Sequence, residues 1–357
     1  MHLNIFERCG DLLYLLSYMQ KIKQFLSDLS APAKIVITTH MNPDADALGS
    51  SLGLCMILRN RGLDVVVVTP NDFPEFLKWM PQSNEVIIYE QTAELAQDKI
   101  SQAQVICCLD FSDLKRVGEL GVHVSNSPAT KILIDHHRDP EKFASYCLWS
   151  TEAGATAELV FDLIAELSWL DLIDESVANC LYAGIMTDTG GFRHPNTTQH
   201  IHEIVAKLIG MGANISLVSK LIYDTNSVDR LRLTGFSLLD RLVVLPEYNV
   251  AYIYLSQEDM RRFHVQTGDT EGLVNYALSI KDVTMAAIFK ERRDMVKISF
   301  RSIGDFSVND FARKNFDGGG HINAAGGISQ FSLSDTIKKF EELLPKYKNE
   351  LLSTQHA

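Results

Sequence analysis

Apolar runs and amphipathic segments alternate along the first half of the chain. A short run of mostly apolar residues indicates a buried strand, and apolar residues at every third or fourth position indicate a helix. Helices are expected at Ala47–Arg61, which Gly62 ends, and at Thr92–Ser101. This alternation predicts a mostly parallel sheet with helices on both faces. The strands expected in that sheet are Lys34–Thr39, Asp64–Thr69, Val86–Tyr89, Val105–Asp110 and Lys131–Asp135.

The second half of the chain follows a different pattern. Its pattern predicts helices from about Gly154 to Gly212, with one helix over Asp174–Met186. After a connecting stretch, short strands and helices return. The strands expected there are Val250–Leu255, Asp282–Glu291 and Met295–Ser302, and the helices are Val308–Asn315 and Ser334–Leu344.

These patterns predict an α/β protein with two domains. The N-terminal domain is expected over residues 1–212, with a helical extension over 1–30. A helical linker is expected over 213–245, and a smaller C-terminal α/β domain over 246–345. We expect the ligand site in the cleft between the two domains, since such clefts commonly bind ligands.

The first thirty residues place apolar side chains at roughly helical spacing. Glu7 and Asp11 interrupt them before any long apolar core, which is unlike a secretory signal peptide. We therefore expect helices that pack on the first domain. Apolar stretches elsewhere are short and interrupted by charge, so neither a membrane span nor a membrane partner is predicted.

Composition narrows the classes of function. The 357-residue chain is 46% hydrophobic and 22% charged, which is typical of a folded globular protein. Its formal net charge is −12 and it has no run of Lys and Arg, so binding to a long duplex is not expected. Short phosphorylated molecules fit this charge better. The six cysteines form no CxxC pair and lie mostly in apolar runs, which predicts reduced thiols and a cytoplasmic location.

Four apolar runs end in acidic or histidine residues. In open α/β sheets, ligands bind beyond the carboxyl ends of the strands, so these clusters are expected to lie together. The first is followed by small residues that leave room for ions and a phosphate beside the start of a helix. The four clusters are His40-Met41-Asn42-Pro43-Asp44-Ala45-Asp46, Leu109-Asp110, Asp135-His136-His137 and Thr187-Asp188-Thr189-Gly190-Gly191.

Charge balance indicates a metal centre at these clusters. Several carboxylates in one dry pocket repel one another and lose hydration, unless cations neutralise them. Two divalent cations would do so, and carboxylate-rich ligands favour Mn²⁺, with Mg²⁺ as the alternative. Asp110, central in the order of motifs, is the candidate bridge between the ions. The candidate ligands are His40, Asp44, Asp46, Asp110, His136 and Asp188.

At these residues the chain resembles the DHH phosphoesterase superfamily, which is named for the motif Asp135-His136-His137. The order of all four motifs matches that superfamily. Downstream, Ser299–Ser302 and Asp317–Gly327 resemble the substrate-binding DHHA1 domain and its GGGH signature. The resemblance covers about Lys34 to Gln330. Length and domain plan are most similar to the nano-RNase and pAp-phosphatase branch, which hydrolyses very short RNAs and 3′,5′-nucleoside bisphosphates.

The resemblance implies a role for each residue of the first domain. One ion is held by His40, Asp44 and Asp110. The other is held by the set Asp46, Asp110, His136 and Asp188. The catalytic residues are His137, which faces the substrate phosphate, and Asp135, which orients the two histidines.

Further residues are implied or suggested as contacts to the substrate. The resemblance implies that Arg301 and the turn Gly318, Gly319, Gly320 and His321 hold the far phosphate or the base of a nucleotide. Arg193, close to the fourth cluster, is a candidate phosphate contact, and Arg138 is a weaker one. His194, His200 and His202 are loosely spaced, and surface histidines are the simpler interpretation.

The function implied is two-metal phosphoester hydrolysis, in which water activated by the ions attacks the phosphorus in line. The expected substrates are short RNA oligonucleotides, cleaved to mononucleotides, and nucleoside bisphosphates such as pAp, converted to AMP. The oligomeric state stays open, with a homodimer as one option. No Ser or Cys occupies the setting of a covalent nucleophile.

Three alternatives remain from the sequence. One is a phosphodiesterase for linear or cyclic dinucleotides such as pApA, pGpG and c-di-AMP, although its membrane-anchored form has spans and sensor domains not seen here. Another is a RecJ-like single-strand exonuclease, which would be expected to add a basic OB-type domain. The third is an inactive nucleotide-binding protein, which the complete set of candidate ligands disfavours.

Overall fold

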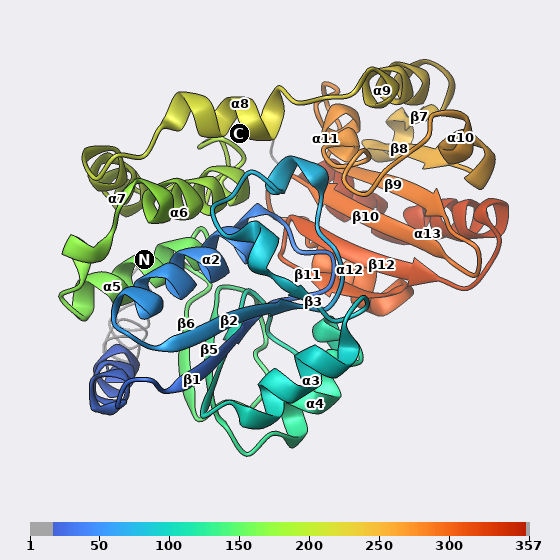
Figure 1. Ribbon diagram of the computed structural model, residues 1–357. Coiled ribbons are helices and arrows are strands. Elements are labelled where there is room, and N and C mark those ends of the chain that lie inside the picture. The colour runs from blue at the N-terminus through green and yellow to red at the C-terminus, as the bar shows by residue number, and fades with distance from the viewer. Residues whose placement is uncertain (1–16, 355–357) are drawn as a thin grey trace. The chain divides into compact units, whose positions relative to one another are not determined.

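The computed structural model describes residues 17–354 (Figure 1). The chain consists of two compact units, Met1–Thr225 and Asn226–Ala357. The division falls inside the segment 213–245 that the sequence marks as a connection. The helix over residues 215–223 belongs to the first unit and the helix over residues 228–240 to the second.

The first unit contains a six-stranded sheet in which every pairing is parallel, which confirms the mostly parallel sheet expected. Its strand order is β3-β2-β1-β4-β5-β6. The chain runs outward from β1 to β3 and then returns to β4 on the other side of β1, so β1 and β4 flank the switch point where such sheets bind ligands. The strands are β1 Lys34–Thr38, β2 Asp64–Thr69, β3 Ile87–Ile88, β4 Val105–Leu109, β5 Thr130–Asp135 and β6 Tyr146–Trp149.

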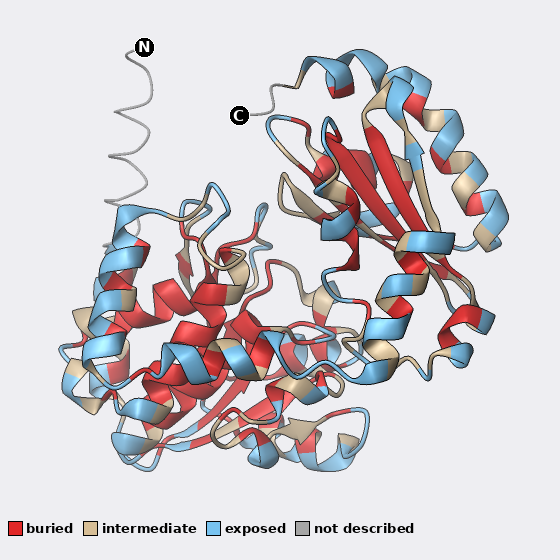
Figure 2. Ribbon diagram, turned by 90° about the horizontal axis from the view of Figure 1, so that it is seen from above, coloured by how far each residue is buried: buried red, intermediate tan, exposed pale blue. Residues whose placement is uncertain are grey.

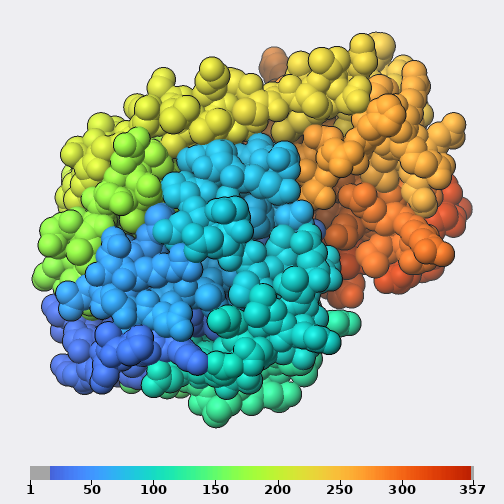
Figure 3. Space-filling view, in the orientation of Figure 1, coloured from blue at the N-terminus to red at the C-terminus, as the bar shows by residue number. Residues whose placement is uncertain are grey.

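Helices cover both faces of this sheet, and the burial pattern explains why the strands are uninterrupted apolar runs. Ile35 and Ile37 of β1 pack into the core formed with α2, α5 and α6, while Val36 between them packs toward α3 and α4. Figure 3 shows one side of this unit, whose surface is formed by blue, cyan and green residues with yellow ones along the upper edge. The helices are α2 Ala45–Asn60, α3 Ala93–Gln102, α4 Leu120–Asn126, α5 Thr156–Glu166, α6 Glu175–Asp188, α7 Gln199–Gly210 and α8 Ile215–Tyr223, with short 3-10 turns at Glu75–Leu77, Ser83–Glu85, Leu114–Val117 and Leu170–Leu172.

The N-terminal helical extension lies partly outside the described residues. Residues 17–28 are helical, and their Met19, Ile22 and Leu26 are buried in the core of the first unit. Between residues 17 and 354, no single helix is long and apolar enough to cross a membrane. The bent pair Gln199–Gly210 and Ile215–Tyr223 reaches that length and composition only when the two helices are taken together.

The second unit contains a mixed sheet of order β11-β12-β10-β9-β8-β7, in which only β8 and β9 are parallel. Its strands are β7 Leu242–Leu245, β8 Val250–Leu255, β9 Met285–Glu291, β10 Val296–Ser302, β11 Asp317–Gly320 and β12 Ala324–Ser329. Its helices are α9 Val228–Asp240, α10 Gln257–Arg262, α11 Leu273–Leu278, α12 Val308–Asn315 and α13 Leu333–Ser353, with a 3-10 turn at Pro246–Tyr248.

The two faces of the second sheet differ. On one face Phe289 and Phe300 pack against Phe311 of α12 and Phe340 of α13, with ring centroids 5.2 to 6.3 Å apart. The other face packs its apolar residues of β8 and β9 against α9 to α11. Figure 2 shows buried strands in both units, each with helices whose outer surfaces are exposed.

Two expectations for the second unit were wrong. Helix α13 continues nine residues beyond Leu344, because Leu351 is buried one heptad further along the same helix. Gly318–Gly320 is not a turn but part of the edge strand β11. A Cβ atom on Gly318 would lie 2.1 Å from the carbonyl oxygen of Gly326, so only glycine lets β12 approach this closely.

Candidate metal centre

The acidic and histidine residues of the first unit meet beyond the carboxyl ends of its central strands. His40 follows β1, Asp110 follows β4 directly, and Asp135 is the last residue of β5, with His136 and His137 next to it. Asp44 caps the start of α2, Asp46 lies in the first turn of that helix, and Asp188 is the last residue of α6. The cluster therefore surrounds the switch point between β1 and β4.

Besides the group of Asp110, Asp135 and His137, the cluster contains two groups of candidate ligands. In each group, one ligand atom from every residue lies within 4.8 Å of the others. Asp110 faces both groups: its Oδ2 is 3.3 Å from His40 Nε2, and its Oδ1 is 3.5 Å from His136 Nε2. The groups are His40 with Asp44 and Asp110, and Asp46 with His136 and Asp188.

Local backbone geometry explains how these side chains reach their places. Asn42 has φ of +56°, and with Pro43 it turns the chain out of β1 before α2 begins. Oδ1 of Asp44 then accepts hydrogen bonds from the N–H groups of Asp46 and Ala47, while its Oδ2 lies 3.8 Å from His40 Nε2. Asp110 has φ of +65°, a region that is costly for a residue with a Cβ atom and typical of functional positions.

The orientation of two imidazole rings fits a metal. Nδ1 of His40 lies 2.9 Å from the carbonyl oxygen of Met41, and Nδ1 of His136 lies 3.2 Å from that of Ala153. A carbonyl oxygen accepts only, so each Nδ1 carries the hydrogen and each Nε2 is directed toward carboxylates. A bare Nε2 lone pair facing carboxylate oxygens is repulsive, so each Nε2 must carry either a proton or a metal ion. These residues therefore fit divalent cations.

His137 is held differently from His136. Its Nδ1 lies 2.8 Å from Oδ1 of Asp135, and the two histidine rings meet edge to face with centroids 4.9 Å apart. The expectation that Asp135 orients both histidines needs correction, because the Ala153 carbonyl, rather than Asp135, faces Nδ1 of His136. Asp135 itself is fully buried, and the hydrogen bond that it accepts through Oδ1 fixes the ring of His137.

Burial and mutual repulsion dominate the electrostatics of the cluster. Burial raises the pKa of Asp46 well above its usual range, and the charges of Asp110 and Asp188 raise it further. Burial also opposes ionisation of Asp110, yet hydrogen bonds from His136 and His40 hold the pKa of Asp110 well below its usual range. Burial lowers the pKa of His136, but Asp110 and Asp188 outweigh it and raise that pKa well above normal. The cluster is thus a concentration of negative charge that cations would stabilise.

The residues expected to bind substrate lie mostly in the second unit. Arg301 lies on β10. The register between β10 and β9 places Lys297 of β10 and Lys290 of β9 on the same sheet face as Arg301. Burial lowers the pKa of Lys290 to about 8, and the charges of Arg292, Lys297 and Arg301 lower it further, against the opposing effect of Glu271. Lys290 and Lys297 were not singled out in the sequence. Gly318, Gly319 and Gly320 lie on the edge strand β11, and His321 follows it.

The other candidate side chains do not form a single cluster. Arg193 is exposed after α6, and its Nε donates to the Gly190 carbonyl oxygen at 2.8 Å. Nδ1 of His194 faces the Asp188 carbonyl oxygen at 3.3 Å, His200 pairs with Asp162 at 2.9 Å, and His202 lies against the ring of Phe192. Thr156, which the sequence interpretation missed, contacts two of the candidate ligands.

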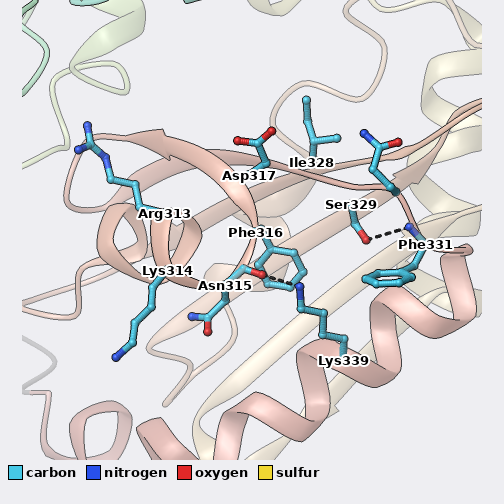
Figure 4. A pocket seen from close by; sticks show the side chains of 10 residues that line it. Arg313, Lys314, Asn315, Phe316, Asp317, Ile328, Ser329, Phe331 and Lys339 are labelled. Atoms are coloured by element: carbon cyan, nitrogen blue, oxygen red, sulfur yellow. Dashed lines mark hydrogen bonds between the residues drawn. The ribbon is translucent and has the colours of Figure 1, made fainter.

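A cavity of about 470 Å³ lies in the second unit between α12, β11, β12 and α13 (Figure 4). Lys339 reaches across one wall, where its amine donates to the Asn315 carbonyl oxygen at 2.6 Å and lies over the ring of Phe316. The lining contains no histidine and one carboxylate, that of Asp317. Its chemistry is therefore unlike that of a metal centre.

Comparisons with known proteins agree with the division of the chain into two parts. The family model for the DHH family, N-terminal domain, matches residues 34–185, and the model for the DHHA1 domain matches residues 247–351. A crystal structure of an exopolyphosphatase-related protein from Bacteroides fragilis superposes with a TM-score of 0.88 at 41% identity, covering 94% of this chain and 98% of that one.

Relatives with assigned activities differ in how much of their length the chain covers. The bifunctional oligoribonuclease and PAP phosphatase NrnA of Thermus thermophilus is 31% identical, over 93% of this chain and 94% of the relative. The cyclic-di-AMP phosphodiesterase PdeA of Listeria monocytogenes is 27% identical over 91% of this chain but only 50% of its own length. RecJ of Thermus thermophilus, solved in complex with Mn²⁺, shares the fold at a TM-score of 0.52 and 12% identity.

Proposed function

Because this chain belongs to the DHH family and carries that family's N-terminal domain followed by a DHHA1 domain, we propose that it is a metal-dependent phosphoesterase. The family membership confirms the resemblance inferred from the motifs. Its substrates are very short oligoribonucleotides, which it cleaves to mononucleotides, and 3′,5′-bisphosphates such as pAp, which it converts to AMP. The relative from Thermus thermophilus, matched over nearly its whole length, carries both activities in its name.

One observation supports the metal-dependent chemistry most strongly: Asp110 turns one oxygen toward each group of candidate ligands. In the proposal, His40, Asp44 and Asp110 hold one divalent cation. The set Asp46, Asp110, His136 and Asp188 holds the other. Mn²⁺ is the preferred ion and Mg²⁺ the alternative, as expected for a carboxylate-rich site. Two such ions, when bound, polarise the attacking water and neutralise charge on the phosphoryl group.

His137 and Asp135 are the proposed catalytic pair. Because Asp135 accepts the hydrogen of His137 Nδ1, the ring is fixed and Nε2 becomes the nitrogen that acts on the substrate. In its protonated form this nitrogen donates to a phosphoryl oxygen or to the leaving oxygen, which stabilises the charge that develops there. The backbone of Asp135 continues β5, so the position of His137 is tied to the sheet.

Cationic side chains of the DHHA1 domain are the proposed contacts for the rest of the substrate. Arg301 binds the phosphate away from the scissile bond, with Lys290 and Lys297 on the same sheet face contributing positive charge. Gly318–Gly320 and His321 contact the nucleotide through backbone and imidazole groups, and Arg193 contacts a phosphate from the first unit. Three features support these contacts: the positive charge of the side chains, the register between β9 and β10, and the match to the DHHA1 domain.

A cyclic or linear dinucleotide phosphodiesterase is the second candidate. It is favoured by the likeness to the Listeria phosphodiesterase, but the chain spans only half the length of that relative. The likeness to RecJ concerns the fold alone. An inactive nucleotide-binding protein would not need two complete groups of ligand atoms.

Parallel hydrolysis assays test the proposal. The full chain would be incubated with Mn²⁺ or Mg²⁺ and with diribonucleotide, pAp, pApA, c-di-AMP or a twenty-nucleotide RNA. We expect the diribonucleotide and pAp to be hydrolysed fastest, with no turnover after chelation of the metal. Faster turnover of c-di-AMP would favour the second candidate. No metal-dependent hydrolysis of any of these substrates would refute both.

A further inference from the structure

We propose that Thr156 is a positioning residue that fixes Asp110 and Asp46 and so sets the affinity of both metal positions. This inference rests on the proposed two-metal centre, and its test does not depend on the identity of the substrate. Thr156 is the first residue of α5 and is fully buried. It lies 46 residues from Asp110 and 110 from Asp46 along the chain.

The two hydrogen-bond donors of Thr156 contact different carboxylates. Its hydroxyl donates to Oδ1 of Asp110 at 2.9 Å, and its backbone N–H donates to Oδ2 of Asp46 at 2.6 Å. The next N–H, that of Ala157, donates to Oδ1 of Asp46 at 2.9 Å. Both oxygens of Asp46 and one oxygen of Asp110 are therefore held by the start of a single helix.

The start of α5 suits this role because its N–H groups need acceptors. The first N–H groups of any helix have no partner within the helix, and the helix dipole favours negative charge there. Ala155 at the cap position has no side chain that accepts a hydrogen bond. Asp46, from a distant part of the sequence, takes the place of a cap. Gly184 of α6 packs closely against the carboxylate of Asp46, since a Cβ atom on Gly184 would lie 2.6 Å from Oδ1 of Asp46.

The hydroxyl of Thr156 contacts only one of the two carboxylate oxygens of Asp110, namely Oδ1. Oδ1 of Asp110 is the oxygen that faces His136, while Oδ2 faces His40. A donor on Oδ1 restricts rotation of the carboxylate, so that the two oxygens stay directed at the two ligand groups. Partners that orient ligands in this way typically change metal affinity by about 10- to 100-fold when removed.

A purely structural role would have a different signature. If Thr156 only completes the start of α5, its replacement lowers the melting temperature of the metal-free protein and leaves metal binding unchanged. If it positions the ligands, the dissociation constant for Mn²⁺ rises even where the metal-free protein keeps its fold. Calorimetric titration of the full chain with Mn²⁺ separates the two.

Three variants separate the hydroxyl from the N–H. Thr156→Ser keeps both groups, and we expect its Mn²⁺ affinity to stay within about threefold of the parent protein. Thr156→Val keeps the shape and the N–H but loses the hydroxyl, and we expect a loss of at least about tenfold. Thr156→Pro loses both groups, so we expect a larger loss of Mn²⁺ affinity. The variant should still fold, because Pro is tolerated at the first helical position and Ala155 before it is already extended.

Thr69→Val is the matched control, since Thr69 is a fully buried threonine at the end of β2. We expect this control to bind Mn²⁺ like the parent protein. Wild-type affinity for two ions in Thr156→Val, with or without a lower melting temperature, would overturn the inference. If Thr156→Val fails to fold, Thr156→Ala replaces it, and the same comparison with Thr156→Ser applies. Absence of hydrolysis in the parent protein would refute the proposed function and leave this titration interpretable.

Discussion

The two sheets of the molecule have six strands each but carry their polar groups in different places. In the first, all strands are parallel and both faces are covered by helices, so the polar side chains gather beyond the strand ends. In the second, strands are mostly antiparallel, and β10 alternates buried Ile298 and Phe300 with the half-buried Lys297, Ser299 and Arg301. The first sheet therefore gathers its polar groups beyond the carboxyl ends of its strands, and the second presents them in a row on one face.

Under the proposed function, this difference corresponds to separate tasks for the two units. Residues at strand ends are carried by short loops and converge from several strands, which suits the enclosure of metal ions. Residues on a strand face repeat every second position and form a row, which suits contact with an extended, charged substrate. We therefore expect substitutions in the first unit to act on metal binding and chemistry, and substitutions in the second to act on substrate choice.

The largest effect is expected for Asp110→Ala. Loss of the shared carboxylate should lower metal occupancy at both positions and reduce kcat by at least about 10³-fold, because both ions depend on it. Metal analysis of the purified variant and steady-state rates on a diribonucleotide measure this. Asp98→Ala, at an exposed acid of α3, is the control and should retain both. Near-normal turnover with two bound ions would show that Asp110 does not bridge.

The neighbouring histidines should separate metal binding from catalysis. His136→Ala should lower Mn²⁺ content, because Nε2 of His136 faces Asp188 at 3.2 Å and Asp110 at 3.5 Å. His137→Ala should keep its Mn²⁺ and lose about 10²- to 10³-fold in kcat, as for a residue that stabilises developing charge. The opposite pattern in metal analysis would mean that the two roles are exchanged.

A smaller effect, and one of a different kind, is expected in the second unit. Arg301→Ala should leave Mn²⁺ binding intact and reduce kcat/KM for a diribonucleotide by about 10²-fold, which corresponds to about 2–3 kcal/mol for a lost charge-assisted contact. It should also flatten the preference for short RNAs. Rates over a series from two to twenty nucleotides measure this, with the exposed Lys338→Ala as control. An unchanged length profile would mean that this sheet face does not contact the substrate.

The smallest predicted effect depends on pH. Burial first, and then neighbouring cations, lower the pKa of Lys290 from 10.5 to about 8, so its charge is present at pH 7 and is lost as the pH rises through about 8. Affinity for pAp should then fall by up to about tenfold between pH 7 and pH 9. Lys290→Arg keeps its charge throughout and should flatten that profile. Identical pH profiles for the two proteins would remove Lys290 from the substrate site.

The contrast between the sheets also explains what the sequence could predict. The strands and motifs of the first unit could be predicted because each buried strand is a continuous apolar run and the candidate site residues follow it directly. That order alone predicts that His40, Asp110 and Asp135 lie together beyond the carboxyl ends of the strands. The short edge strand β6 was missed, because Tyr146–Trp149 has half-buried residues and no long apolar run.

The residues missed elsewhere have no contiguous signal. Lys290 and Lys297 become neighbours only through the pairing of β9 with β10. Gly318–Gly320 resembles a flexible turn by composition, and only the close approach of β12 makes it a strand. Thr156 contacts carboxylates far away in the sequence. The one local hint was Ala155, since a helix that begins without a capping side chain needs an acceptor from elsewhere.

Anomalous diffraction from crystals of the full chain grown with Mn²⁺, recorded at the manganese absorption edge, tests the two-metal centre most directly. We expect two peaks about 3.5–4 Å apart. Asp110 should lie between them, with His40 and Asp44 around one peak, and Asp46, His136 and Asp188 around the other. A single peak, or two peaks that do not share Asp110, would contradict this expectation.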